Sequence, residues 1–273
     1  MDTPSYHISL AVSVFFLVGL ALDFSFIFKK NRKPLAGIPT NVPWNWADFA
    51  LVTLFFLLFQ QAMVMFFDSM IKTWTPVKIY KDPLIWFSSF IVGLATFIFL
   101  IRFLRIRYSV GLKELGLARP IQLRWFGTGF FYYCGAIPVL VFVGIITKVL
   151  GDYFGIPLEP QAPLKMLKKE TLSLNIIIIS LFIVGVAPFF EEIFFRGFVY
   201  PLIKKFLGYR WAMILSSLFF AMLHFSFLAF LPITCIGLFL AYLYEKTGSL
   251  FSSIFFHSLN NLIAVLIVIF VLK

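Results

Sequence analysis

Long apolar runs separated by short polar segments make up almost the whole chain. A membrane-spanning helix needs roughly 17–25 mainly apolar residues, and eight runs reach or approach that length. The seventh run is short and follows the sixth without a polar linker, so Pro232 marks either a tight reversal or a kink. The pattern predicts an all-α polytopic membrane protein with seven or eight transmembrane helices. The runs are residues 8–28, 47–67, 84–103, 126–150, 172–190, 211–228, 229–244 and 250–272.

Composition agrees with that pattern and sets the expected topology. Hydrophobic residues make up 61% of the chain and charged residues 13%, whereas soluble domains have about 45–50% and 25%. The net charge is +11, but the basic residues lie in short segments between apolar runs and form no single stripe, so we expect no nucleic-acid partner. With the N-terminus outside, the positive-inside rule places segments 29–33, 102–124 and 196–210 and Lys246 in the cytoplasm.

Three smaller features carry structural predictions. Cys134 and Cys235 each lie inside an apolar run, so we expect buried side chains and no disulfide. The segment 112–120 predicts a short amphipathic helix at the membrane interface. Thr247, Gly248 and Ser249 predict a turn followed by the N-cap of the last helix.

A cluster of ionisable residues follows the fifth apolar run. Glu191 and Glu192 come directly after an uncharged stretch, and Arg196 follows four residues after Glu192. An ionisable side chain in a membrane span costs about 2.5–3.5 kcal/mol on insertion scales, so such a cluster indicates a site. At 100° per residue, Arg196 lies about 40° around a helix from Glu192 and about 140° from Glu191. We therefore expect Arg196 to pair with Glu192 and Glu191 to serve as a general base, with a purely structural set of ion pairs as the alternative.

Two histidines stand in four-residue frames further along the chain. His224 follows Phe220 by one helical turn, so Phe220 is expected to hold the imidazole and exclude water. His257 and Asn261 are related in the same way, and together they can supply two hydrogen-bond donors to one oxygen, as an oxyanion hole requires. Taken singly, these residues also fit a role as hydrogen-bonding partners between helices.

The three motifs together are far more specific than any one of them. Glu-Glu-x-x-x-Arg, Phe-x-x-x-His and His-x-x-x-Asn, in this order, resemble the signature of the type II CAAX prenyl protease and bacteriocin-processing (CPBP) family of intramembrane proteases. The words Leu-Gly-Leu-Ala-Arg-Pro at 115–120 and Leu-Ser-Ser-Leu-Phe-Phe-Ala-Met-Leu-His at 215–224 are also similar to that family. The resemblance covers roughly the C-terminal half of the chain.

The resemblance implies a domain organisation and a set of roles. Residues 121–273 would form a CPBP-like catalytic membrane core, and residues 1–120 would form N-terminal membrane spans and an interfacial linker. Glu191 and His224 would activate the attacking water, and His257 and Asn261 would stabilise the oxyanion. Glu192 and Arg196 would position Glu191, and Phe220 would support the site.

The donor atoms leave two mechanisms open. Glu191, His224 and His257 could hold zinc with water as a fourth ligand, but the sequence shows no further carboxylate that would orient either histidine. We expect a metal-free, glutamate-dependent enzyme without a cofactor, and zinc is the alternative.

The sequence thus predicts an intramembrane endopeptidase that cleaves peptide bonds near the cytoplasmic face. Its substrates would be membrane proteins or peptides, lipidated ones included, and its location the lipid bilayer of a bacterial plasma membrane. The alternative from another class is a catalytically silent membrane scaffold or bacteriocin-immunity protein. A transporter is a third reading, which inverted repeats would support, and the sequence shows no repeat.

Overall fold

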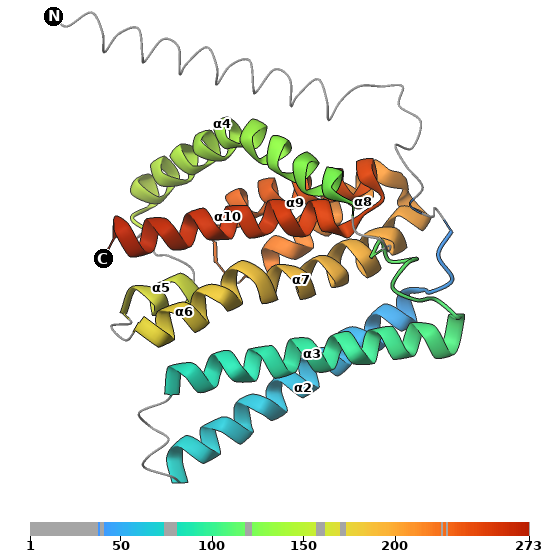
Figure 1. Cartoon of the computed structure of the whole chain (residues 1–273), viewed down its shortest axis with the longest axis horizontal. Coiled ribbons are helices and arrows are strands. Elements are labelled where there is room, and N and C mark those ends of the chain that lie inside the picture. The colour runs from blue at the N-terminus through green and yellow to red at the C-terminus, as the bar shows by residue number, and fades with distance from the viewer. Residues whose placement is uncertain are drawn as a thin grey trace, which may run out of the picture.

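The computed structural model describes residues 38, 41–73, 81–117, 122–156, 162–169, 173–224, 226–227 and 229–272. Within these ranges the regular structure is helical throughout, which confirms the all-α prediction (Figure 1). The helices are α2 Trp46–Thr73, α3 Lys81–Tyr108, α4 Leu123–Phe154, α5 Ala162–Lys169, α6 Ser173–Leu181, η2 Phe182–Val186, α7 Ala187–Glu192, η3 Ile193–Val199, α8 Tyr200–Met222, α9 Phe230–Thr247 and α10 Leu250–Phe270.

Most of the predicted spans correspond to helices. The described residues contain five helical stretches that are long and apolar enough to cross a membrane: Trp46–Met70, Phe87–Tyr108, Leu123–Phe154, Leu174–Met222 and Leu250–Phe270. The predicted run 229–244 corresponds to helix α9. The predicted run 8–28 lies outside the described residues.

The stretch Leu174–Met222 holds the fifth and sixth predicted spans, because the chain reverses within α8. Gly208 has φ 79° and ψ 170°, a backbone conformation that residues with a Cβ rarely adopt. This non-helical residue interrupts the helix and changes the direction of the chain. The rings of Phe195 and Phe220, which lie at similar distances along the chain before and after Gly208, are 5.0 Å apart. The two arms therefore pack against each other as antiparallel helices.

The charged residues of segment 196–210 are not all at the surface. Arg196 is fully buried in η3, and Lys204 is 4% exposed in α8. The Lys204 Nζ atom lies 2.8 Å from Glu245 Oε1 of α9, because a buried ammonium group needs a counter-charge. Only the reversal itself reaches the surface, where Leu207 is 51% exposed.

The helices surround α10 in a way that brings the motif residues together. Helix α10 contacts α4 on one side and η2 and α7 on the other, while α9 packs against α8, α4 and α10 (Figure 1). A Cβ atom on Gly237 of α9 would lie 2.9 Å from Ser217 Cβ of α8, so only glycine allows this close approach. The α2–α3 pair meets the bundle through α3, where Gly93 lies against the ring of Phe190, and at the start of α2, where the rings of Phe49 and Phe219 of α8 are 5.8 Å apart.

The predicted amphipathic helix at 112–120 does not form in its described part. Residues 112–116 are turns, and Gly116 has φ 88°. Leu115 is fully buried, its carbonyl accepts from Tyr244 Oη at 3.1 Å, and Gly116 O accepts from Leu250 N at 3.0 Å. The protein core therefore buries Leu115 and Leu117 of this segment, whereas Leu112 is 39% exposed.

The predicted turn and N-cap at the start of α10 are confirmed. Ser249 caps α10 by accepting a hydrogen bond from Phe251 N, and Gly248 before it has φ 66°. Cys134 and Cys235 form no disulfide, and both are only partly buried, whereas the sequence predicted buried side chains.

Candidate active site

Two π-helical turns frame the Glu191–Glu192 pair. Helix α7, which ends at Glu192, lies between η2 and η3, and the N–H of Tyr200 reaches the carbonyl of Phe195 five residues back. Each π turn carries more residues than an α-helical turn, so it changes which face of the following helix meets a neighbour. π turns are rare in proteins overall, but those that occur are often found at functional sites. Sequence periodicity at a constant 100° per residue could not reveal them.

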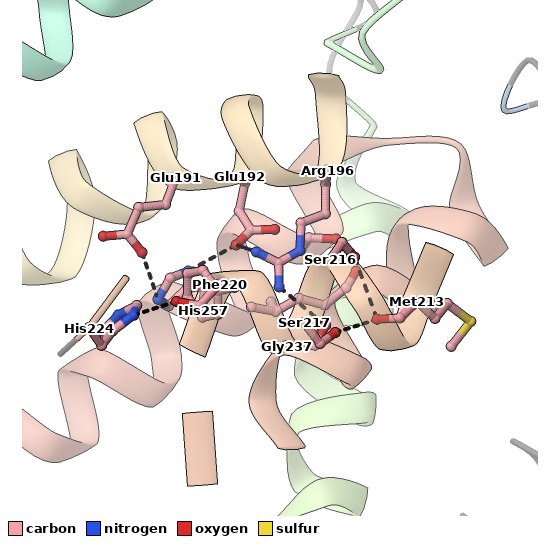
Figure 2. Close-up of polar contacts among 12 residues, drawn as sticks. Glu191, Glu192, Arg196, Met213, Ser216, Ser217, Phe220, His224, Gly237 and His257 are labelled. Atoms are coloured by element: carbon pink, nitrogen blue, oxygen red, sulfur yellow. Dashed lines mark hydrogen bonds and ion pairs between the residues drawn. The ribbon is translucent and has the colours of Figure 1, made fainter. Parts of the chain in front are cut away.

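Glu192 and Arg196 form the buried end of the site. Both side chains are completely inaccessible, and Arg196 Nη1 donates to Glu192 Oε1 at 3.1 Å. The other terminal nitrogen, Nη2, donates to the carbonyl of Gly237 at 3.1 Å. The predicted pairing of Arg196 with Glu192 is confirmed, and Figure 2 shows both residues reaching from one helix toward α9 and α10.

His257 joins the two glutamates. Its Nδ1 atom lies 3.0 Å from Glu192 Oε1, and its Nε2 atom lies 3.8 Å from Glu191 Oε2 (Figure 2). A carboxylate only accepts, so the proton on Nδ1 is donated to Glu192 and Nε2 is aimed at Glu191. Glu192 is thus the carboxylate that orients His257. The sequence had shown no further carboxylate for this role.

Glu191 forms the accessible end of the site. Its side chain is 32% exposed, in contrast to the inaccessible Glu192. Its Oε2 atom is nevertheless buried and has no hydrogen-bond partner among the described residues. One oxygen of Glu191 therefore faces the imidazole of His257, and the side chain as a whole can be reached from outside.

His224 lies beyond the C-terminal end of α8 and not within the span. Its Nδ1 atom is 2.8 Å from the carbonyl of Phe220, which can only accept, so the neutral ring carries its proton on Nδ1 and keeps the Nε2 lone pair. The buried Phe220 ring lies 4.7 Å from that of His224 and 5.7 Å from that of His257. The guanidinium of Arg196 sits 4.6 Å from the centre of the same ring. Phe220 therefore contacts both imidazoles, as its predicted supporting role requires.

Asn261 has a partner that the sequence did not suggest. Asn261 lies one helical turn after His257 on α10. Its Nδ2 atom donates to the carbonyl of Ile183 in η2 at 2.8 Å. An amide nitrogen carries two protons, so one N–H remains for a further acceptor. The carbonyls of Ile183 and Gly237 are backbone groups, which no motif search would single out.

The described residues do not provide a ready metal site. No group of three or more His, Cys, Asp or Glu side chains stands at metal-holding distances in the part of the chain that the structure describes.

Fold and site together define a multi-pass membrane protein with ionisable residues gathered inside its helical core. Residues 173–263 match the family model described as type II CAAX prenyl endopeptidase Rce1-like, which confirms the resemblance found in the motifs. The matched segment runs from the start of α6 into α10 and contains Glu191, His224, His257 and Asn261. No curated protein and no solved structure matches the chain significantly. The match supports a CAAX-type intramembrane protease in general terms.

Proposed function

We propose that the protein is an intramembrane endopeptidase that hydrolyses peptide bonds with water activated by Glu191 and His224. The observation that carries the proposal is the pairing of Glu191 with His257. One carboxylate of the cluster, Glu191, is partly accessible and faces the imidazole of His257, while the other is buried and holds that imidazole in place. A set of purely structural ion pairs would not need this division between an accessible and a buried carboxylate.

The hydrolysis would begin when Glu191 takes a proton from water and the water oxygen attacks the scissile carbonyl carbon. His224 keeps an Nε2 lone pair because the Phe220 carbonyl holds its Nδ1 proton, so it can accept the second hydrogen bond of the water. When the C–N bond breaks, the proton on Glu191 passes to the leaving amine. The products are a carboxylic acid and a free amine, and atoms and charge balance.

The negative oxygen that forms during attack needs donors. His257 in its protonated form offers Nε2–H, and its charge is supported by Glu192 at Nδ1. Asn261 offers the N–H that Ile183 does not use. Removing one such donor typically costs about 2.7–4 kcal/mol of transition-state stabilisation, which is on the order of a hundredfold to a thousandfold in rate.

Substrates, location and domains follow from the same proposal. Membrane-associated proteins or peptides, lipidated ones included, would reach the accessible Glu191 from the bilayer of a plasma membrane, and no nucleic acid takes part. Residues 121–273 would be the catalytic core and residues 1–120 the accompanying spans and linker. The alternative remains a silent scaffold or immunity protein that keeps the fold and binds peptides without cleaving them.

The test compares the Glu191→Gln variant with the matched Glu114→Gln variant, whose exposed carboxylate accepts a hydrogen bond from Gly111 N. Each is assayed in liposomes with a quenched fluorescent farnesylated peptide, and membrane peptidomes of expressing cells are compared. Glu191→Gln should abolish cleavage while thermal unfolding stays unchanged, and Glu114→Gln should behave as wild type. Near-native turnover by Glu191→Gln would show that another group is the base. Wild-type protein inert toward the peptide and the membrane proteome would favour the scaffold.

A further inference from the structure

A side-chain donor from a distant element reaches each of the two π turns around the glutamate pair. In η2 the Ile183 carbonyl accepts from Asn261 of α10 at 2.8 Å. In η3 the Phe198 carbonyl accepts from the indole Nε1 of Trp44 at 3.0 Å. Helix α7, with Glu191 and Glu192 at its end, therefore lies between two π turns that each accept a hydrogen bond from a distant side chain.

Trp44 is itself held firmly. Its side chain is 2% exposed and stacks on the ring of Phe198, with centroids 5.7 Å apart and an interplanar angle of 28°. The segment that carries it is fixed by α8, because Lys204 Nζ donates to Ile38 O at 3.2 Å and Lys205 Nζ donates to Val42 O at 3.0 Å. Burial, stacking and these two hydrogen bonds thus hold the indole N–H in one position.

The register of η3 decides where the site residues point. If the five-residue bonds of η3 relaxed to four-residue bonds, the helix before the turn would rotate by about 100° relative to the helix after it. Arg196 lies within η3 and Glu192 directly before it, and both meet partners on α9 and α10. Such a rotation would move Glu191 and Glu192 away from His257.

We propose that Trp44 is a positioning residue for the Glu191–His257 pair, because its indole N–H holds the π turn that sets the rotation of the glutamate-bearing helix. Trp44 lies outside the segment 173–263 that matches the family model. The N-terminal part of the chain would then complete the site without touching the substrate. The effect on turnover rests on the proposed function, whereas the effect on the turn does not.

The experiment removes the N–H and keeps the stacking. Trp44→Phe is compared with Trp46→Phe, whose ring is 46% exposed and stacks on Phe206. A second variant carries benzothienylalanine at position 44, which has the shape of tryptophan without the N–H, in case Trp44→Phe does not fold. Hydrogen exchange of the amides in residues 193–203 and steady-state cleavage of the farnesylated peptide are measured for each.

We expect about tenfold faster exchange in residues 193–203 and about tenfold lower kcat with unchanged KM for both position-44 variants, and wild-type behaviour for Trp46→Phe. A merely structural role would instead speed exchange across the whole bundle and leave kcat per folded molecule unchanged, which would overturn the proposal. Wild-type exchange in residues 193–203 would overturn it as well. If the wild-type protein cleaves nothing, the proposed function fails, and the exchange data alone still decide whether Trp44 holds the turn.

Discussion

Replacing Arg196 with methionine tests the electrostatic logic of the buried cluster. The change keeps much of the side-chain volume but removes the donor to Glu192, the donor to Gly237 O and the cation above Phe220. Glu192 is then left inaccessible to solvent with His257 as its remaining partner. The folded protein must either bury an uncompensated negative charge or take up a proton.

The magnitude follows from that stranded charge. Breaking a buried ion pair by removing one partner costs about 3–5 kcal/mol, and we expect Arg196→Met to lower the free energy of unfolding by that amount. Glu192→Gln should cost a similar amount because it strands the guanidinium. The double variant removes both charges, so its loss should be smaller than the sum of the two single losses by about 0.5–3 kcal/mol.

The measurement is a double-mutant cycle by denaturant titration of the protein in detergent micelles, repeated at several pH values. The penalty of Arg196→Met should shrink as the pH falls, because a folded state that binds an additional proton gains stability on acidification. Additive single losses, or a penalty for Arg196→Met that does not depend on pH, would refute the reasoning that Arg196 neutralises Glu192.

Three further predictions concern packing, topology and metal. Gly237→Ala should lower the free energy of unfolding by about 1–3 kcal/mol, because its Cβ would collide with α8. Gly144→Ala is the control: its Cβ would meet no atom within 4 Å, so it should not destabilise the protein. The same denaturant titration measures both variants. Cysteines placed at Lys168 and Leu207 should be labelled by an impermeant reagent from opposite sides of the membrane, and labelling from one side would contradict the expected topology. Extended chelation should leave peptide cleavage unchanged, while one tightly bound zinc per chain in elemental analysis, lost together with activity, would contradict the metal-free mechanism.

The candidate site could be assembled from the sequence only in part. Helical angles predicted the pair of Arg196 with Glu192, because residues four apart share a face even when a π turn lies between them. They did not predict that His257 would bridge Glu191 and Glu192, since that contact joins elements far apart in the chain. The donor to Phe198 O was missed for the same reason: nothing in the sequence around Trp44 points to a backbone carbonyl in η3.

The sequence by itself determined the class of protein and the position of its spans. Long apolar runs must become helices in a bilayer, because a helix satisfies its own backbone hydrogen bonds, and that requirement acts on each run separately. Tertiary structure decided which charges are buried. Lys204 reads as a loop residue next to other basic residues, yet its partner is Glu245 on α9. Such pairings depend on how helices pack and reverse, as at Gly208, and a one-dimensional hydrophobic pattern holds no information about them.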